Sequence, residues 1–219
     1  GNVPWYSHTI EAADTTALYK ERDDREMVMD SVLQDINYAC DHIMNRAETT
    51  VTPSMALAMK SRICLFEGTY RKYHAVNPST GEAWKDATAS QRFLQECVAA
   101  SEKIMNSGMF KLYNTGKPET DYRYVFQQEK PVKDEVIWAK EYSAELSSYH
   151  NLTQLFVSSG NQSNRWSPTQ EFVNTYLNRD GSRFTDAAGY ETKNFVQNST
   201  NRDCRLAQSM MMPGYSKLN

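Results

Sequence analysis

The sequence lacks the motifs that most often identify an enzyme or a metal site. It contains no HExxH, GxSxG, GxxxxGK[ST] or GxGxxG pattern and no EF-hand loop. Its 4 histidines are scattered, and its 4 cysteines form no CxxC pair. We therefore expect no catalytic residue, no metal site and no cofactor. Three of the cysteines fall in helical patterns, where free cysteine usually packs as a small apolar side chain.

A long apolar run and an excess of positive charge are also missing. No segment approaches the ~18 apolar residues of a membrane-spanning helix. The formal net charge is −3, whereas nucleic-acid-binding domains are usually basic, so we expect no nucleic-acid partner. The first residues, Gly1–Tyr6, lack the basic start and apolar core of a signal peptide, and there is no initiating Met. We therefore expect a processed product or an internal segment of a longer protein.

Three segments in the first half have the apolar spacing of amphipathic helices. They are residues 23–45, 52–74 and 88–107. The first begins with Asp23 and Glu26 at the spacing of a capping box. The second begins with Thr52 as N-cap and Pro53 at the first helical position, and Gly108 follows the third, which is typical of a helix C-terminus.

Long helices with short links are typical of stacked helical hairpins, and start-to-start spacings of about 30 and 35 residues lie near the tetratricopeptide period. After residue 112 the sequence becomes polar and rich in turn residues. Asp134–Tyr142 alternates weakly, which favours a short strand, and Ser167–Gln170 has the pattern of a helix start. We predict a mainly all-α protein with little β structure. A tetratricopeptide-like scaffold occupies residues 1–112, and a loop-rich region, part of one larger domain, occupies residues 113–219.

The stretch from Ser61 to His74 combines apolar, aromatic and basic residues. The apolar positions in and before it that recur at the spacing of one helix face are Met59, Ile63, Phe66, Tyr70 and Tyr73. Gly68 interrupts this helix, at a cost of about 1 kcal/mol against alanine unless a neighbour needs the room. We predict that the apolar positions form a helix-packing face and that a second helix approaches closely at Gly68.

Sugar binding requires an exposed aromatic plane beside hydrogen-bonding side chains such as Asn, Gln, Asp or Arg. The segment from residue 149 to residue 166 has that composition. The candidate glycan-binding residues are Trp166 with Asn161, Asn164 and Arg165, followed by Tyr149 and Trp84. Two interpretations of Trp166 remain open: a stacking surface for a sugar, and an anchor in the core just before the helix at residue 168.

The string Leu65–His74, LFEGTYRKYH, resembles a signature of the SusD/RagB family, surface glycan-binding lipoproteins of Gram-negative bacteria. Other segments resemble parts of this family in the same order. They are Val3–Tyr6, Tyr19–Arg22, Asp134–Trp138, Pro168–Tyr176 with Asp180–Gly181, and Asn201–Leu206 with Pro213–Gly214. Cys204 stands where the family usually has proline. Family members are much longer, so the resemblance implies a middle segment without the lipid-bearing N-terminal cysteine.

The resemblance implies an outer-membrane, surface-exposed protein that binds oligosaccharides or polysaccharides. Such a protein passes them to a SusC-like TonB-dependent transporter, and it acts without catalysis or a cofactor. Its only tie to the membrane would be a lipid anchor absent from this chain. Two alternatives remain: a helical-repeat scaffold that binds only proteins, with no sugar site of its own, and a glycan-cleaving enzyme, for which no reaction motif is present.

Overall fold

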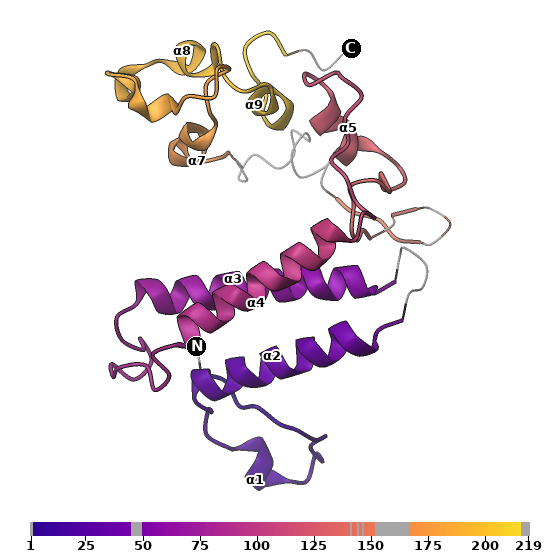
Figure 1. Ribbon diagram of the computed structural model, residues 1–219, viewed down its shortest axis with the longest axis vertical. Coiled ribbons are helices and arrows are strands. Elements are labelled where there is room, and N and C mark those ends of the chain that lie inside the picture. The colour runs from indigo at the N-terminus through magenta and orange to yellow at the C-terminus, as the bar shows by residue number, and fades with distance from the viewer. Residues whose placement is uncertain are drawn as a thin grey trace. The chain divides into compact units, whose positions relative to one another are not determined.

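The computed structural model describes residues 2–44, 50–140, 142, 143, 145, 147–151 and 167–215 (Figure 1). The described chain is mainly α-helical, as predicted, and its only extended pairings are the isolated bridges Ser143↔Ser148 and Asn178↔Arg202. Two compact units form: unit 1 comprises residues 1–111 and 136–139, and unit 2 comprises residues 112–135 and 140–219. The tetratricopeptide-like arrangement stays a prediction.

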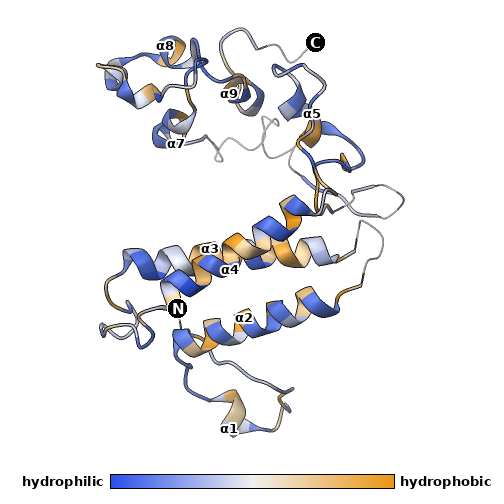
Figure 2. Cartoon of the chain, viewed as in Figure 1, coloured by the Kyte–Doolittle hydropathy of each residue, from blue (hydrophilic) through white to orange (hydrophobic). Residues whose placement is uncertain are grey.

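The described residues of unit 1 form three long helices and one short helix. The helices are α1 (Thr15–Leu18), α2 (Arg25–His42), α3 (Pro53–Tyr73) and α4 (Ala89–Asn106). The three long helices predicted from the sequence are therefore all present. Helix α3 packs against both α2 and α4, and each long helix carries both hydrophilic and hydrophobic residues (Figures 1 and 2).

The predicted ends of α3 and α4 are confirmed. The Thr52 hydroxyl accepts the Met55 amide at 3.2 Å, and Pro53 occupies the first turn. Gly108 follows α4 with a φ of +68°, a left-handed conformation that glycine adopts without strain.

The predicted cap of α2 was wrong by one residue. Asp24, rather than Asp23, accepts the Glu26 amide, at 3.0 Å. Asp23 instead accepts the backbone amide of Trp5 at 2.8 Å and the Lys20 ammonium at 2.7 Å. Asp23 has the sequence spacing of a helix cap, but its carboxylate holds the N-terminal segment instead of the first turn of α2.

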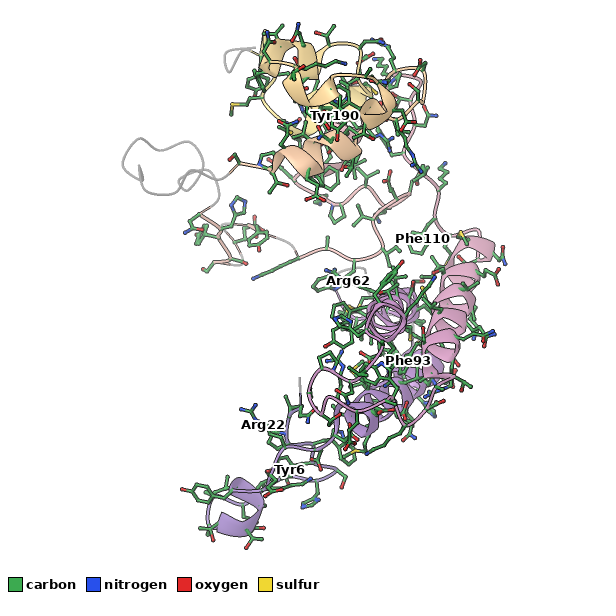
Figure 3. The ribbon with its side chains drawn as sticks, turned by 90° about the vertical axis from the view of Figure 1, so that its left-hand side faces the viewer. Tyr6, Arg22, Arg62, Phe93, Phe110 and Tyr190 are labelled. Atoms are coloured by element: carbon green, nitrogen blue, oxygen red, sulfur yellow. The ribbon has the colours of Figure 1, made fainter. Side chains whose placement is uncertain are left out.

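The apolar core of unit 1 lies where the three long helices meet. It consists of Leu33, Cys64, Ala89 and Phe93. Phe93 is fully buried among these helices (Figure 3). Full burial of a phenylalanine side chain stabilises a fold by about 1.5–3 kcal/mol.

The predicted close approach at Gly68 is confirmed. A Cβ atom on Gly68 would lie 2.8 Å from Leu94 Cγ and 3.1 Å from the Leu94 backbone nitrogen. The Ser90 hydroxyl also donates to the Gly68 carbonyl at 2.8 Å. Glycine is therefore needed here because α4 occupies the space of a side chain.

The predicted packing face of α3 was wrong. Phe66 and Tyr73 are 61% and 75% exposed, and Met59 is also exposed. The buried face is instead mostly polar and small, and its members are Ser54, Ala56, Lys60, Cys64, Glu67, Gly68 and Arg71. Charged residues of α3 are buried because they form ion pairs there. A prediction from the spacing of apolar residues alone therefore identified the exposed face as the packing face.

A buried network of charges joins α2 to α3. Glu67, with 0% exposure, accepts Arg25 Nη2 of α2 at 2.5 Å and Arg71 Nε at 2.9 Å. Arg71 Nη1 lies 3.4 Å from Glu26 Oε2. The four side chains of Arg25, Glu26, Glu67 and Arg71 thus form a charge-balanced set, which we call the buried quartet. A charge in this position is tolerated only when it is paired and hydrogen-bonded.

The quartet also holds the segment that precedes α4. Glu26 accepts the backbone amides of Lys85 and Asp86 at 3.0 and 3.2 Å. The Arg71 guanidinium lies 5.2 Å from the ring centres of both Trp84 and Phe93. Charge pairing and the apolar core therefore meet at Arg71.

The described residues of unit 2 form short helical elements. They are α5 (Asp121–Gln127), α7 (Gln170–Thr175), η1 (Phe184–Asp186), η2 (Tyr190–Thr192), α8 (Phe195–Ser199) and α9 (Cys204–Ser209). Most span fewer than two turns and show no sequence period. The helix start expected at Ser167–Gln170 is present, and the N-cap of α7 is Thr169.

The short strand predicted at Asp134–Tyr142 does not form. Residues 134–140 have turn or irregular backbone, beginning with a turn in which the Glu135 amide donates to the Val132 carbonyl at 3.1 Å. A strand needs a neighbour to satisfy its backbone groups, and no sheet is present among the described residues.

The buried quartet predicts the result of removing one of its charges. We expect Glu67→Gln to lower the free energy of unfolding by about 3–5 kcal/mol, because two buried guanidiniums lose their shared carboxylate. Glu102→Gln, on the exposed side of α4, is the matched control and should change it by about 0.5 kcal/mol or less. Urea unfolding followed by tryptophan fluorescence compares them, and equal midpoints would contradict the assignment.

Close packing at Gly68 predicts a coupled effect with Leu94. We expect Gly68→Ala to destabilise the protein by on the order of 1 kcal/mol, because overpacking outweighs the gain in helix propensity. In a Leu94→Ala background the two closest contacts, with the Leu94 side chain, are absent and only the backbone nitrogen at 3.1 Å remains, so the same change should cost less by on the order of 1 kcal/mol. A double-mutant cycle in urea measures both values. A Gly68→Ala change that stabilises the protein while Leu94 is present contradicts the close contact.

Candidate functional site

Most of the predicted sugar-binding residues lie outside the described part of the chain. These are Trp166, Asn161, Asn164 and Arg165. Their role stays a prediction. Tyr149 is described in unit 2, where its side chain is 71% exposed.

Trp84 lies in unit 1 against the end of α3. Its indole N–H donates to the His74 carbonyl at 2.7 Å, and its ring meets Tyr70 edge-on at 6.2 Å. Since the Arg71 guanidinium also lies over the ring, much of Trp84 is engaged in holding the α3–α4 loop. Trp84 and Tyr149 belong to different units, so no common site is assigned to them.

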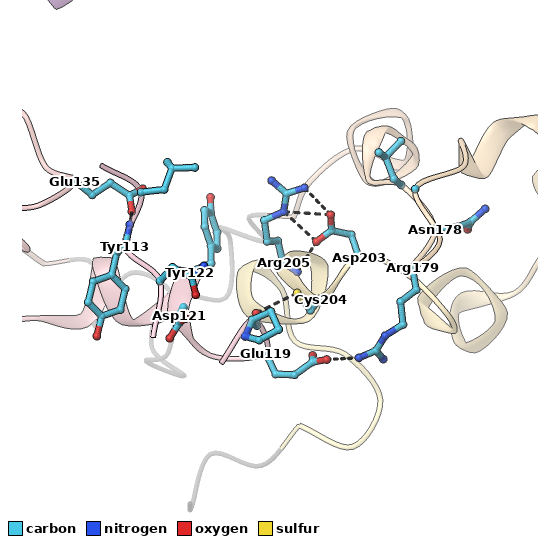
Figure 4. Close-up of a pocket in the computed structure, with 15 residues that line it drawn as sticks. Tyr113, Glu119, Asp121, Tyr122, Glu135, Asn178, Arg179, Asp203, Cys204 and Arg205 are labelled. Atoms are coloured by element: carbon cyan, nitrogen blue, oxygen red, sulfur yellow. Dashed lines mark hydrogen bonds and ion pairs between the residues drawn. The ribbon is translucent and has the colours of Figure 1, made fainter. Parts of the chain in front are cut away.

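Unit 2 contains a groove of about 620 Å³ between the region of α5 and the segments around α7 and α9 (Figure 4). Its walls combine aromatic, charged and amide side chains. They are Leu112, Tyr113, Asn114, Pro118, Glu119, Asp121, Tyr122, Glu135, Leu177, Asn178, Arg179, Gly181, Asp203, Cys204 and Arg205.

Tyr122 of α5 provides an aromatic wall for this groove. Its side chain is 39% exposed and also lines an adjoining hollow of about 460 Å³. That hollow shares Leu177, Asp203 and Arg205 with the groove and adds Phe172, Thr175 and Tyr176. Aromatic surface therefore continues from one hollow into the next, beside polar groups.

An ion pair lies next to Tyr122 in the groove. Arg205 Nη2 donates to Asp203 Oδ2 at 2.5 Å, and Arg205 Nε donates to Asp203 Oδ1 at 3.0 Å (Figure 4). These hydrogen bonds lower the pKa of the Asp203 carboxyl and raise the pKa of Arg205. Asp203 also caps α9 by accepting the Arg205 amide at 2.9 Å, which fixes the pair at the start of the helix.

A second ion pair joins Arg179, in the turn after α7, to Glu119, just before α5 (Figure 4). Its two side chains are well exposed, so the pair contributes little to stability. Both pairs offer carboxylate oxygens as acceptors and guanidinium nitrogens as donors within the groove.

Two further carboxylates form fixed parts of the wall. Asp121 accepts the Thr115 hydroxyl at 2.6 Å and the amides of Thr115 and Lys117 at 2.8 and 3.2 Å. The bond from the Thr115 hydroxyl is the largest cause of a lowered pKa at Asp121. Glu135 accepts the Tyr113 amide at 2.7 Å. Both carboxylates therefore hold the loop before α5.

Arg202 positions the opposite wall. Its buried guanidinium donates to the carbonyls of Val173, Tyr176 and Asn198 at 2.7–2.8 Å. It also lies 3.8 Å from the ring centre of Phe184, and burial lowers its pKa. These contacts tie α7 to the residues that lead into α9.

The two walls are joined by hydrogen bonds between α5 and α9. Arg123 donates from its backbone amide to Gln208 Oε1 at 2.9 Å and from its guanidinium to the Ala207 carbonyl at 2.5 Å. Gln208 and Cys204 both donate to the Pro118 carbonyl, at 2.7 and 3.0 Å. The cysteine that replaces the proline of the family pattern therefore contributes a contact between the walls, and burial raises the pKa of its thiol.

The described residues contain no cluster of three or more His, Cys, Asp or Glu side chains that could hold a metal ion. In the same residues, no helix is both long enough and apolar enough to cross a bilayer.

Sequence reasoning missed the residues of this groove. Glu119 and Arg179 are 60 positions apart, and Arg123 and Gln208 are 85 apart, so no local spacing connects them. Two signals in the sequence lie beside the groove, namely the turn at Asp180–Gly181 and the Asn201–Leu206 segment, and both also resemble parts of the SusD/RagB family.

The contacts of Arg202 predict that its substitution destabilises the surrounding region strongly. We expect Arg202→Met to destabilise the α7–α9 region by about 3 kcal/mol or more, because three half-buried backbone carbonyls lose a charged donor. Arg179→Met removes an exposed guanidinium and is the matched control. Hydrogen exchange of residues 173–206 should accelerate in the first variant only. Equal exchange in the two variants contradicts a central role for Arg202.

Comparison with known proteins finds a similarity in the C-terminal part of the chain. Residues 134–219 match the model of the SusD family. The match begins at the Asp134–Trp138 segment and includes α7 and α9, while the Ser61–His74 stretch lies outside it. No curated protein and no solved structure matches the chain significantly. The chain is therefore similar to the SusD family over residues 134–219, which are 86 of its 219 residues.

Proposed function

We propose that this protein binds oligosaccharides or polysaccharides at the cell surface for uptake through a SusC-like TonB-dependent transporter. The SusD family has a general role in glycan binding for nutrient uptake, and its members are non-catalytic. They are generally lipoproteins of the outer-membrane surface and work with SusC-like transporters. For this chain, the transporter partnership, the location and the ligand are proposals.

The groove of unit 2 is the proposed glycan site. The observation that carries the proposal is the exposed Tyr122 ring beside the Asp203–Arg205 ion pair. A sugar ring has apolar C–H faces that pack on an aromatic plane, and hydroxyl groups that both donate and accept. Phe172 and Tyr176 in the adjoining hollow would extend the contact to a second sugar unit.

The loop that ends at Trp166 remains a second candidate for glycan contact. Its support is compositional, from Trp166 with Asn161, Asn164 and Arg165. Tyr149 belongs to the same segment and presents an exposed ring. Separate substitutions in the groove and in the loop distinguish the two positions.

The alternative function, a scaffold that binds only proteins, has one supporting observation. The outer face of α3 exposes Phe66 and Tyr73, together with Met59 and Leu65. Exposed apolar side chains gathered on one helix are typical of protein interaction sites. This alternative predicts co-purification with an outer-membrane barrel and no response to any glycan.

Tyr122→Ala tests the proposed site. Against a broad panel of polysaccharides, measured by calorimetry and affinity electrophoresis, we expect the unaltered chain to bind at least one polymer. Tyr122→Ala should weaken that binding about tenfold, equivalent to about 1.4 kcal/mol, because the aromatic plane is lost. Phe66→Ala, an exposed aromatic side chain on α3, is the matched control and should leave binding unchanged.

Two results would contradict the proposal. If no polymer binds, glycan capture by this chain is wrong. If Trp166→Ala abolishes binding while Tyr122→Ala leaves it unchanged, the glycan site is the loop and not the groove.

A further inference from the structure

We propose that the groove selects uncharged glycans and discriminates against glycans that carry carboxylates. The inference rests on the proposed function and concerns the ligand class of the same site. It follows from the way the charged side chains of the groove are already paired.

The walls of the groove contain more carboxylates than guanidiniums. The carboxylates are those of Glu119, Asp121, Glu135 and Asp203, and the guanidiniums are those of Arg179 and Arg205. Arg179 is paired with Glu119, and Arg205 is paired with Asp203. Neither cation is therefore available to an anionic ligand without displacement of a carboxylate that would remain in the groove.

The other two carboxylates have no ion-pair partner among the described residues. Asp121 is held by the hydroxyl and the amide of Thr115 and by the amide of Lys117, and Glu135 is held by the amide of Tyr113. Lys117 lies close enough to lower the pKa of Asp121 but does not line the groove. The groove thus presents a net negative field to its ligand.

An acidic sugar and a neutral sugar meet this field differently. A uronate carboxylate is repelled by Asp121 and Glu135, and this repulsion weakens as salt screens it. A neutral sugar avoids the repulsion, because its hydroxyls donate to carboxylate oxygens and accept from guanidinium nitrogens. The paired charges of the groove therefore disfavour binding of an acidic sugar, whereas they offer hydrogen bonds to a neutral one.

Matched polymers test this selectivity. The probes are pullulan, galactomannan and xyloglucan, each compared with the same polymer after oxidation of its primary alcohols to carboxylates. For each polymer that binds at about 20 mM salt, we expect the oxidised form to bind at least tenfold more weakly. The difference in affinity between the neutral and the oxidised polymer should become smaller at about 0.5 M salt, where the screening length is a few Å.

Charge-neutralising variants locate the effect. Glu135→Gln keeps an oxygen that accepts the Tyr113 amide and removes one negative charge, so it should reduce the affinity difference between neutral and oxidised polymers several-fold. Glu119→Gln leaves Arg179 unpaired and should strengthen binding of the oxidised form. Glu129→Gln, an exposed carboxylate of unit 2 outside the groove, is the control and should leave that difference unchanged.

The possible failures are distinguishable. Oxidised polymers that bind as tightly as neutral ones overturn the selectivity and leave the proposed function standing. The selectivity is also overturned if the affinity difference between neutral and oxidised polymers stays the same in both Glu135→Gln and Glu119→Gln. The charges that discriminate would then lie outside the groove. If neither form of any polymer binds, the proposed function fails, and the inference fails with it.

Discussion

Buried arginines determine how each unit of this protein is held together. In unit 1, Glu67 joins Arg25 of α2 to Arg71 of its own helix, and Glu26 completes the charge balance. Because an unpaired buried charge costs several kcal/mol, α2 and α3 are restricted to arrangements in which the four charges meet. In unit 2, where regular structure is sparse, Arg202 binds backbone carbonyls instead. One side chain there satisfies carbonyls that a sheet or long helix would otherwise pair.

The long helices could be predicted from the sequence, but the face that α3 buries could not. Helix positions follow from period, caps and glycines, as the confirmed cap at Thr52 and the glycine at Gly108 illustrate. The buried face depends on pairing between residues distant in the chain, such as Arg25 and Glu67, which are 42 positions apart. The apolar residues that include Phe66 and Tyr73 do recur at the helical period, but they lie on the exposed face of α3 rather than on the buried one.

The candidate site was less predictable than the fold, for a related reason. A sugar-binding composition can be recognised locally, as in the segment that ends at Trp166, but a groove requires walls from separate segments. Tyr122, Arg179 and Arg205 come together only because α5, the turn after α7 and α9 are joined by long-range hydrogen bonds. Family resemblance identified the segments around Arg179 and Arg205 without indicating which side chains would face a ligand.

The central claim is that a glycan occupies the groove of unit 2. The most direct test is backbone hydrogen exchange of the whole chain with and without the polysaccharide that it binds most tightly. The account predicts slower exchange in residues 112–123, 177–181 and 203–206 when the glycan is present. Protection confined to unit 1, or to residues 152–166, would contradict it.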